Sequence, residues 1–256
     1  MRFAQEAGRE LRFRGSAEDR WLEDLVDYAA AFDPDVPARL RPATPEQIAE
    51  LERRCGQPLP RSYRRFLEVM GANQGGILAD YKVHLDIDEV LELYDDLPQR
   101  PENAIPIGRG IMGYCDQLSL KPMPEGEPQV VFSDEEWVGS PIARSLPRLL
   151  LQQAFFRYEL GSYPVRQQYG LQKQLHTLQR CERAATAAGF ARYWFSDGYN
   201  LCGWAEGAAL GAHQPQGGPG WLTVGGVDAE VCARLSDALD ATLGMSFQKK
   251  LVELPE

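Results

Sequence analysis

The sequence predicts an α+β protein, with a mostly antiparallel sheet packed with helices and a smaller α+β unit after it. Amphipathic helical patterns recur along the chain. Between them, short apolar segments are separated by Gly, Pro and Asp turns, which is typical of antiparallel strands. With 256 residues the chain is long enough for one large domain or two small ones. We expect an N-terminal helical extension at 1–40, a main domain at 41–164 and a C-terminal unit at 165–256.

The first helices have clear patterns. Residues 18–32 place Trp21, Leu25 and Phe32 on one apolar stripe. In the next helix Thr44 is a natural N-cap, Pro45 fits the first position, and Gln47 completes a capping box. Gly56 suits a left-handed C-terminal cap, and we expect Gly71 to end the third helix, 61–70, in the same way.

The remaining elements follow from alternation and turn residues. We expect strands at 77–85, 103–108, 113–121 and 128–134, a helix at 86–97, and a helix after Pro147. In the C-terminal unit we expect helices at 171–189 and 228–244 and strands at 190–197, 199–207 and 221–226.

The charge is unevenly distributed. The formal net charge is −10, and the segment from Asp80 to Glu136 holds fourteen acidic residues against four basic ones. This balance argues against non-specific binding to nucleic acid or anionic membranes, because both require clustered Lys and Arg. The acidic segment is either a solvated face that aids solubility or a docking surface for a basic partner.

Residues 44–78, "TPEQIAELERRCGQPLPRSYRRFLEVMGANQGGIL", resemble the opening of SUKH superfamily proteins, with a capped helix, a Leu-Pro pair and a second helix running into a glycine-rich turn. The matching positions are Glu52, Gly56, Leu59, Pro60, Tyr63, Phe66 and Leu67. Later segments, "IPIGRGIMG" and "QVVFSDEEW", are similar to the family's strands, so the resemblance covers about residues 40–160.

The resemblance implies a non-enzymatic immunity protein that binds and neutralises a cognate bacterial toxin, often a nuclease. The partner would be a basic protein whose active groove the acidic surface occludes. From the charge clustering we expect the contacts to come from Asp95, Asp96, Asp134, Glu135 and Glu136, with Trp137 as an apolar anchor. A regulatory scaffold or adaptor, and a metal-dependent hydrolase, are the alternatives.

Gly108, Gly110 and Gly113 have the G-x-G-x-x-G spacing of a dinucleotide loop. That loop requires a helix to begin at its third glycine, whereas the residues after Gly113 are strand-like and stopped by Pro122. We therefore expect a hairpin turn in which these glycines allow tight backbone geometry.

No other pattern predicts chemistry. The five cysteines form no C-x-x-C pair and the three histidines are scattered, so we expect no metal and no cofactor. Unpaired cysteines and the lack of a membrane-length apolar run favour a cytoplasmic location. The aromatic residues Tyr193–Phe195, Trp204 and Trp221 could line a ligand pocket, and the core of the C-terminal unit is the favoured interpretation.

Overall fold

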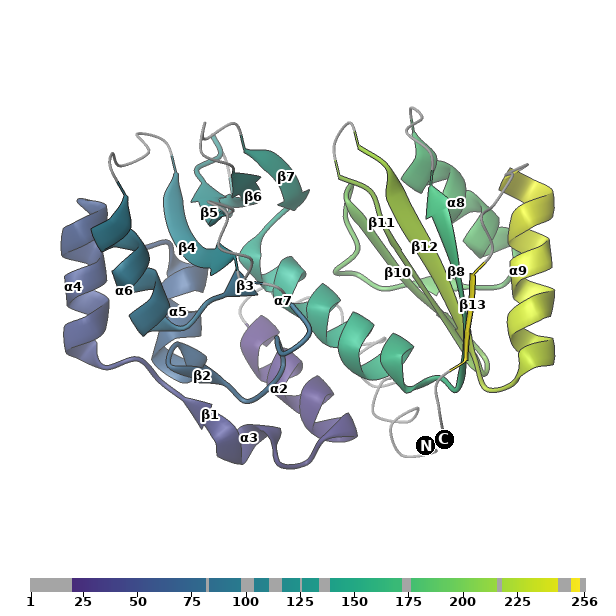
Figure 1. Cartoon of the computed structure of the whole chain (residues 1–256), viewed down its shortest axis with the longest axis horizontal. Coiled ribbons are helices and arrows are strands. Elements are labelled where there is room, and N and C mark those ends of the chain that lie inside the picture. The colour runs from purple at the N-terminus through teal and green to yellow at the C-terminus, as the bar shows by residue number, and fades with distance from the viewer. Residues whose placement is uncertain are drawn as a thin grey trace. The chain divides into compact units, whose positions relative to one another are not determined.

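The computed structural model describes residues 20–81, 83–97, 104–110, 117–124, 126–133, 139–171, 176–215, 218–243 and 250–253. The described residues up to Gln153 form one compact unit and those from Ala154 onward form a second (Figure 1). Both contain helices and antiparallel strands, so the α+β prediction is confirmed. The finer division into 1–40, 41–164 and 165–256 stays a prediction. None of the described helices is long and apolar enough to cross a membrane.

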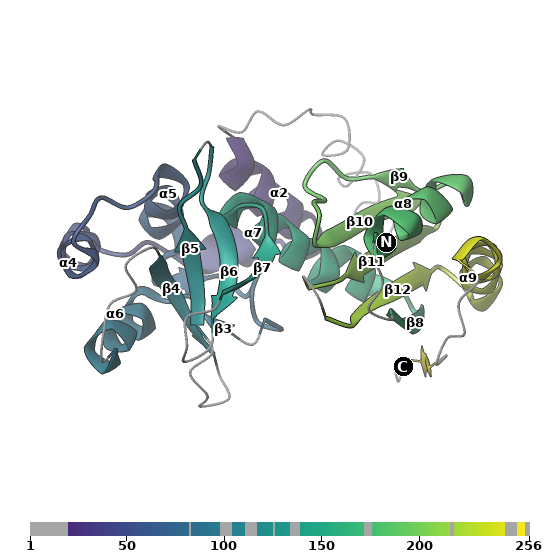
Figure 2. The same ribbon diagram turned by 90° about the horizontal axis from the view of Figure 1, so that it is seen from above.

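The first unit contains a five-stranded antiparallel sheet in the order β3, β4, β5, β6, β7, and a two-stranded ribbon of β1 and β2. Figure 2 shows β4 to β7 side by side in that order, with α6 beyond the β4 end. The strands are β1 (Leu40–Arg41), β2 (Asn73–Gln74), β3 (Val83–His84), β4 (Ile105–Gly110), β5 (Gln117–Lys121), β6 (Gln129–Ser133) and β7 (Ser140–Ala143). The helices are α2 (Trp21–Phe32), α3 (Val36–Arg39), α4 (Pro45–Cys55), α5 (Arg61–Met70), α6 (Ile87–Asp96) and α7 (Leu146–Ala154).

The start and end of α4 are those that the sequence predicts. The Thr44 hydroxyl accepts a hydrogen bond from the Gln47 N–H at 3.2 Å, and the Gln47 side chain accepts one from the Thr44 N–H at 2.8 Å. This reciprocal capping box satisfies two backbone donors that the helix leaves free. Gly56 ends the helix with a left-handed φ of 70°.

Gly71 corrects an expectation. It follows α5 directly, but its φ is −66°, so it is not a left-handed cap like Gly56. A Cβ on Gly71 would lie 2.7 Å from the Cα of Leu67 and 3.0 Å from the Cβ of Ala43. Glycine is needed here because α5 and the chain before α4 approach closely.

The predicted strand at 77–85 is mostly wrong, because only Val83–His84 pairs in a sheet. The preceding residues form successive turns, in which the N–H of Ile77 donates to the carbonyl oxygen of Gln74 and the N–H of Ala79 to that of Gly76. Gly75 and Gly76, both with positive φ, begin these turns. Turn hydrogen bonds therefore replace the strand pairing that the apolar pattern predicts.

Gly108 and Gly110 are also placed differently from the prediction. Both lie inside β4 rather than in a hairpin turn, and Gly113 lies outside the described residues. A Cβ on Gly108 would lie 2.7 Å from Cγ1 of Val83, so this glycine lets β3 approach β4 next to an irregularity in the β4–β5 register. For Gly108 the expected tight backbone geometry is confirmed, but within a strand and not in a hairpin turn.

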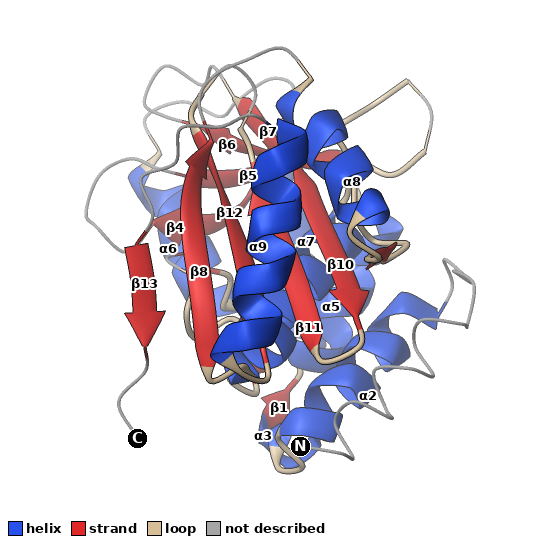
Figure 3. Cartoon of the chain, turned by 90° about the vertical axis from the view of Figure 1, so that its right-hand side faces the viewer, coloured by secondary structure: helices blue, strands red, loops and turns tan. Residues whose placement is uncertain are grey.

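The second unit has a six-stranded antiparallel sheet in the order β13, β8, β12, β11, β10, β9. Figure 3 views it from the side on which α8 and α9 cover the strands. The strands are β8 (Val165–Leu171), β9 (Ala191–Arg192), β10 (Asn200–Ala205), β11 (Ala208–His213), β12 (Gly220–Gly226) and β13 (Lys250–Glu253). The helices are the π-helix η2 (Phe155–Glu159), the 3₁₀-helix η3 (Leu160–Ser162), α8 (Thr177–Ala187) and α9 (Ala229–Leu243).

Two faces of this sheet are packed in different ways. On the helix face, Leu201, Leu210 and Leu222 from the strands meet Cys181 and Cys232 from α8 and α9 in one buried cluster. The opposite face is covered at its centre by η2 and η3, whose side chains pack where strand residues are glycine.

The prediction for 190–197 is also mostly wrong, since only Ala191–Arg192 pairs as a strand. The chain then turns, so that Tyr193 and Phe195 stack at 4.9 Å and are buried beside Phe155. These two aromatic residues belong to the core of the second unit, as expected.

Candidate functional site

Helix α6 places a row of carboxylates on the outside of the first unit. Its Ile87, Val90 and Leu93 are buried, and the opposite side of the helix is exposed. Because residues three to four positions apart share a helix face, the outward side is made entirely of acids. The exposed residues are Asp88, Glu92, Asp95 and Asp96.

Helix α4 lies beside α6 and runs in the same direction. Near the start of both helices, the Gln47 amide donates to Asp88 at 2.7 Å. Near their ends, the Cys55 sulfur lies 3.0 Å from the Tyr94 hydroxyl. Polar contacts along the pair therefore fix how far α6 is shifted relative to α4, and with it the positions of the outward acids.

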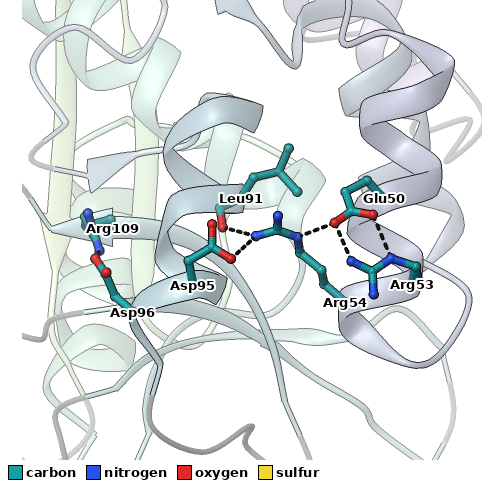
Figure 4. Close-up of polar contacts among 7 residues, drawn as sticks. All are labelled: Glu50, Arg53, Arg54, Leu91, Asp95, Asp96 and Arg109. Atoms are coloured by element: carbon teal, nitrogen blue, oxygen red, sulfur yellow. Dashed lines mark hydrogen bonds and ion pairs between the residues drawn. The ribbon is translucent and has the colours of Figure 1, made fainter.

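Arg54 of α4 is the central connection of this pair (Figure 4). Its guanidinium donates to Glu50 at 2.7 Å, to the Leu91 carbonyl oxygen at 2.7 Å and to Asp95 at 2.6 Å. The Arg54 side chain is only 20% exposed, whereas that of Asp95 is 68% exposed. The cation thus lies beneath the carboxylate, which faces solvent in a fixed orientation.

The charge environment agrees with this geometry. Hydrogen bonds from Arg53 and then Arg54 lower the pKa of Glu50 to about 2. Hydrogen bonds to Glu50 and then Asp95 raise the pKa of Arg54. Glu50, Arg53 and Arg54 are therefore charged at neutral pH, and the two arginines compensate part of the acidic charge.

Asp96 has a separate partner. It forms an ion pair with Arg109 of β4, and again the cation is the less exposed group, at 30% against 67% for Asp96 (Figure 4). This pair connects the end of α6 to the sheet. The structure thus places Asp95 and Asp96 together on one exposed helix end, each with an arginine from another element.

The other expected contact residues, Asp134, Glu135, Glu136 and Trp137, lie outside the described residues. They fall between β6 and β7 in the sequence. The set of six contact residues stays a prediction.

Helix α6 carries three further acids, Asp88, Glu89 and Glu92, which the charge clustering did not predict as contacts. Within the described residues, Glu89 and Glu92 have no ion-pair partner, so they carry charge that no arginine compensates. The spacing of Asp88, Glu92 and Asp96, at i, i+4 and i+8, could have identified the shared face. Arg54 and Arg109 could not have been found in this way, because they are 41 and 13 positions from their acids.

Among the residues that the structure describes, no group of three His, Cys, Asp or Glu side chains is arranged to hold a metal ion. The acids of α6 are spread along the outside of a helix. Such an arrangement fits contacts with a large, positively charged surface.

Comparison with protein families gives one match. The model described as the SMI1 / KNR4 family (SUKH-1) matches residues 42–152, which include α4, α5, α6 and the whole five-stranded sheet. Among curated proteins, none matches the chain.

Proposed function

Because residues 42–152 form a SMI1/KNR4 (SUKH-1) family domain, we propose that this protein is an immunity protein that binds a cognate bacterial toxin and covers its active groove. Domains of this family are typical of immunity proteins against polymorphic toxins and are generally non-catalytic. The family match is the observation that carries the proposal.

A basic partner suits the chemistry of the domain. Enzymes that cleave nucleic acid bind phosphates through Lys and Arg, so a nuclease toxin presents a positive groove. The outward face of α6 carries only acids, and electrostatic complementarity of this kind raises the association rate and suppresses wrong partners. We therefore propose a nuclease as the toxin class.

The proposed contacts are Asp95 and Asp96 on α6, together with Asp134, Glu135 and Glu136, and Trp137 as the apolar anchor. The arginine pairs are compatible with this role. An aspartate carboxylate offers about four acceptor sites on its two oxygens, and Arg54 occupies one oxygen of Asp95. A partner cation can therefore share the carboxylate, and the ordered side chain loses less rotamer freedom on binding.

The first experiment captures the partner. Tagged full-length protein is incubated with lysate of the native host at low and at raised salt, and a retained basic protein is then assayed for nuclease activity. We expect equimolar immunity protein to abolish that activity and raised salt to weaken the complex. A retained protein whose activity is unaffected would contradict neutralisation and favour an adaptor.

The contact residues are tested with matched charge reversals. The variant Asp134→Lys, Glu135→Lys, Glu136→Lys changes the net charge by as much as the control Glu206→Lys, Glu230→Lys, Asp237→Lys, whose positions are exposed in the second unit. We expect the first variant to weaken toxin binding by more than about tenfold and the control by much less. Equal losses of affinity in the two variants would show that binding depends only on the net charge of the protein. The proposed contact residues would then be wrong.

A further inference from the structure

Strand β8 lies between β12 and the C-terminal strand β13 in the second sheet (Figure 3). All seven residues of β8 pair with β12 in a continuous register. The four residues of β13 pair with the first part of β8, from Glu253 opposite Val165 to Lys250 opposite Gln168. Within the described residues, β13 is therefore the outer edge of the sheet, and it stops short of residues 169–171.

The sequence of β8, "VRQQYGL", lacks most of the features that protect a natural sheet edge. Edge strands are usually short, interrupted by a bulge, or supplied with proline or lysine. The opposite edge of the same sheet follows this rule, because β9 has two residues. Strand β8 is long and regular, without proline or lysine, and Arg166 is its single charged residue. Its outer side is therefore a regular row of backbone donors and acceptors that needs a cover.

Strand β13 is the weaker of the two strands that pair with β8. It forms four residue pairs where β12 forms seven, and within the described residues no strand pairs with its other side. Because the stabilisation of a sheet grows with the number of cross-strand pairs, a strand that matches β8 along its whole length gains more from pairing than β13 does. Such a strand can replace β13 at this edge.

A second copy of β8 matches the edge along its whole length. When two β8 strands run antiparallel with Gln168 opposite Gln168, Val165 lies opposite Leu171 and Gln167 lies opposite Tyr169. Paired residues lie on the same face of a sheet. Tyr169 and Leu171 belong to the buried cluster under α8 and α9, and Val165 packs against it. The apolar side of one strand therefore meets the apolar side of the other.

The other face of this pairing gives a role to Gly170. Arg166 of each copy lies opposite Gly170 of the other, so the two arginines do not oppose each other. Gly170 is exposed, and no described atom lies within 4 Å of the position that a Cβ would take, whereas at Gly211 in the same sheet Phe156 lies at 2.7 Å. Packing among the described residues therefore does not require glycine at this position. A glycine inside a strand often marks the close approach of another backbone, and here it leaves room for the long side chain of Arg166.

We propose that the edge of β8 is a binding surface for β8 of a second copy of this chain, and that β13 covers this surface in the single chain. Displacement or removal of β13 then joins two copies through one continuous sheet with two-fold symmetry. The partner is a second copy because the seven-residue pattern is complementary to itself, with no like charges opposed. This self-association does not depend on toxin binding.

The first test disrupts β13 in the full-length protein. Leu251→Pro with Val252→Pro removes two adjacent backbone N–H groups. Because the N–H groups of neighbouring strand residues point to opposite sides, one of the two faces β8. The control, Leu254→Pro with Glu256→Pro, adds the same number of prolines after β13. Light scattering over a range of protein concentrations gives the molar mass of each protein.

We expect the wild type and the control to be monomers and the β13 variant to be a dimer. A β13 variant that stays monomeric at every concentration would overturn the proposal. A dimeric wild type would contradict the covering role of β13, and large aggregates in place of a dimer would contradict the two-fold pairing.

The second test examines the register of the dimer. In the β13 variant, Gln168→Glu or Gln168→Lys places like charges opposite each other at the two-fold axis, and we expect each change to weaken the dimer about three- to tenfold. Mixing the two proteins should restore the affinity, because opposite charges then face each other. The controls Gln179→Glu and Gln179→Lys, at an exposed position of α8, should leave the dimer unchanged. If mixing restores nothing, the proposed pairing is wrong.

If the β13 variant does not fold, cross-linking of the otherwise unchanged full-length protein decides the question. Gln168→Cys brings two thiols together only when two β8 strands pair about this position, and Gln179→Cys is the matched control. Under mild oxidation we expect a disulfide-linked dimer of the first variant in clear excess over the second. No linked dimer, or equal amounts from both variants, would overturn the proposal.

Discussion

The two units hold their helices in place by different means. In the first unit, the exposed end of α6 is held by two ion pairs, one from Arg54 of α4 to Asp95 and one from Arg109 of β4 to Asp96. In the second unit, Phe156 of η2, Leu160 of η3 and Tyr163, which directly follows η3, pack against glycines of the sheet. Surface ion pairs contribute little to folding, whereas close packing leaves no room for added atoms. We expect added side-chain volume beneath η2 to destabilise the second unit. Loss of an ion pair between α4 and α6 should destabilise the first unit less.

The largest expected effect comes from adding one methyl group beneath η2. In Gly211→Ala the new Cβ would lie 2.7 Å from Cε1 of Phe156 and 2.9 Å from Cδ2 of Leu160. We expect a loss of about 1–3 kcal/mol in the free energy of unfolding, measured with urea. The control is Gly170→Ala on β8, where the added atom has open space, with an expected change within about 0.5 kcal/mol. Equal effects of the two variants would mean that strand propensity, and not packing, sets the result.

A smaller effect is expected in the second unit between pH 7 and pH 5. The pKa of His213 is lowered from its ordinary value of 6.5 because the ring is buried. The fold therefore favours the neutral ring, so its contribution is fully present above pH 6.5 and is lost as the pH falls below that value. We expect the urea midpoint of the second unit to fall between pH 7 and pH 5, and to fall less in His213→Gln. An unchanged pH dependence in the variant would assign the acid sensitivity to other groups.

The smallest expected effect is at the helix pair of the first unit. Arg54→Gln removes the ion pair with Asp95 but can keep one hydrogen bond, and we expect it to lower the free energy of unfolding by no more than about 1 kcal/mol. Asp95→Asn should lower it by less, because the amide oxygen can still accept from Arg54. Unfolding curves of both variants at low and high salt check this assignment, because salt screens the ion pair but has little effect on the remaining hydrogen bonds. A loss of several kcal/mol in Arg54→Gln would show that the first unit depends on this residue as strongly as the second depends on Gly211.

The sequence predicts those parts of the fold that local chemistry decides. Thr44, Gln47 and Gly56 define α4 from within a single helix, so its ends could be predicted. Strand β11, "AALGAH", consists mostly of small residues and has no strand pattern of its own, and the sheet alone defines it. Gly108 has a role only because Val83, far away in the sequence, approaches it.

In the candidate site, too, local sequence predicts some features and only the folded arrangement supplies the others. The exposure of Asp95 and Asp96 on α6 follows from helical periodicity, whereas their pairing with Arg54 and Arg109 depends on the folded arrangement of α4 and β4. The cross-strand pairing of Asn200, His213 and Trp221 could not be predicted either, because these residues come from three strands whose register only the structure supplies.

The division of α6 into an inward and an outward side has an evolutionary consequence. Ile87, Val90 and Leu93 alone bury the helix, so substitutions at the exposed positions change the folding free energy little. A lineage can therefore exchange the exposed acids one at a time while the domain stays folded throughout. In the proposed immunity role, recognition of the toxin can diversify on this helix without new selection on the core.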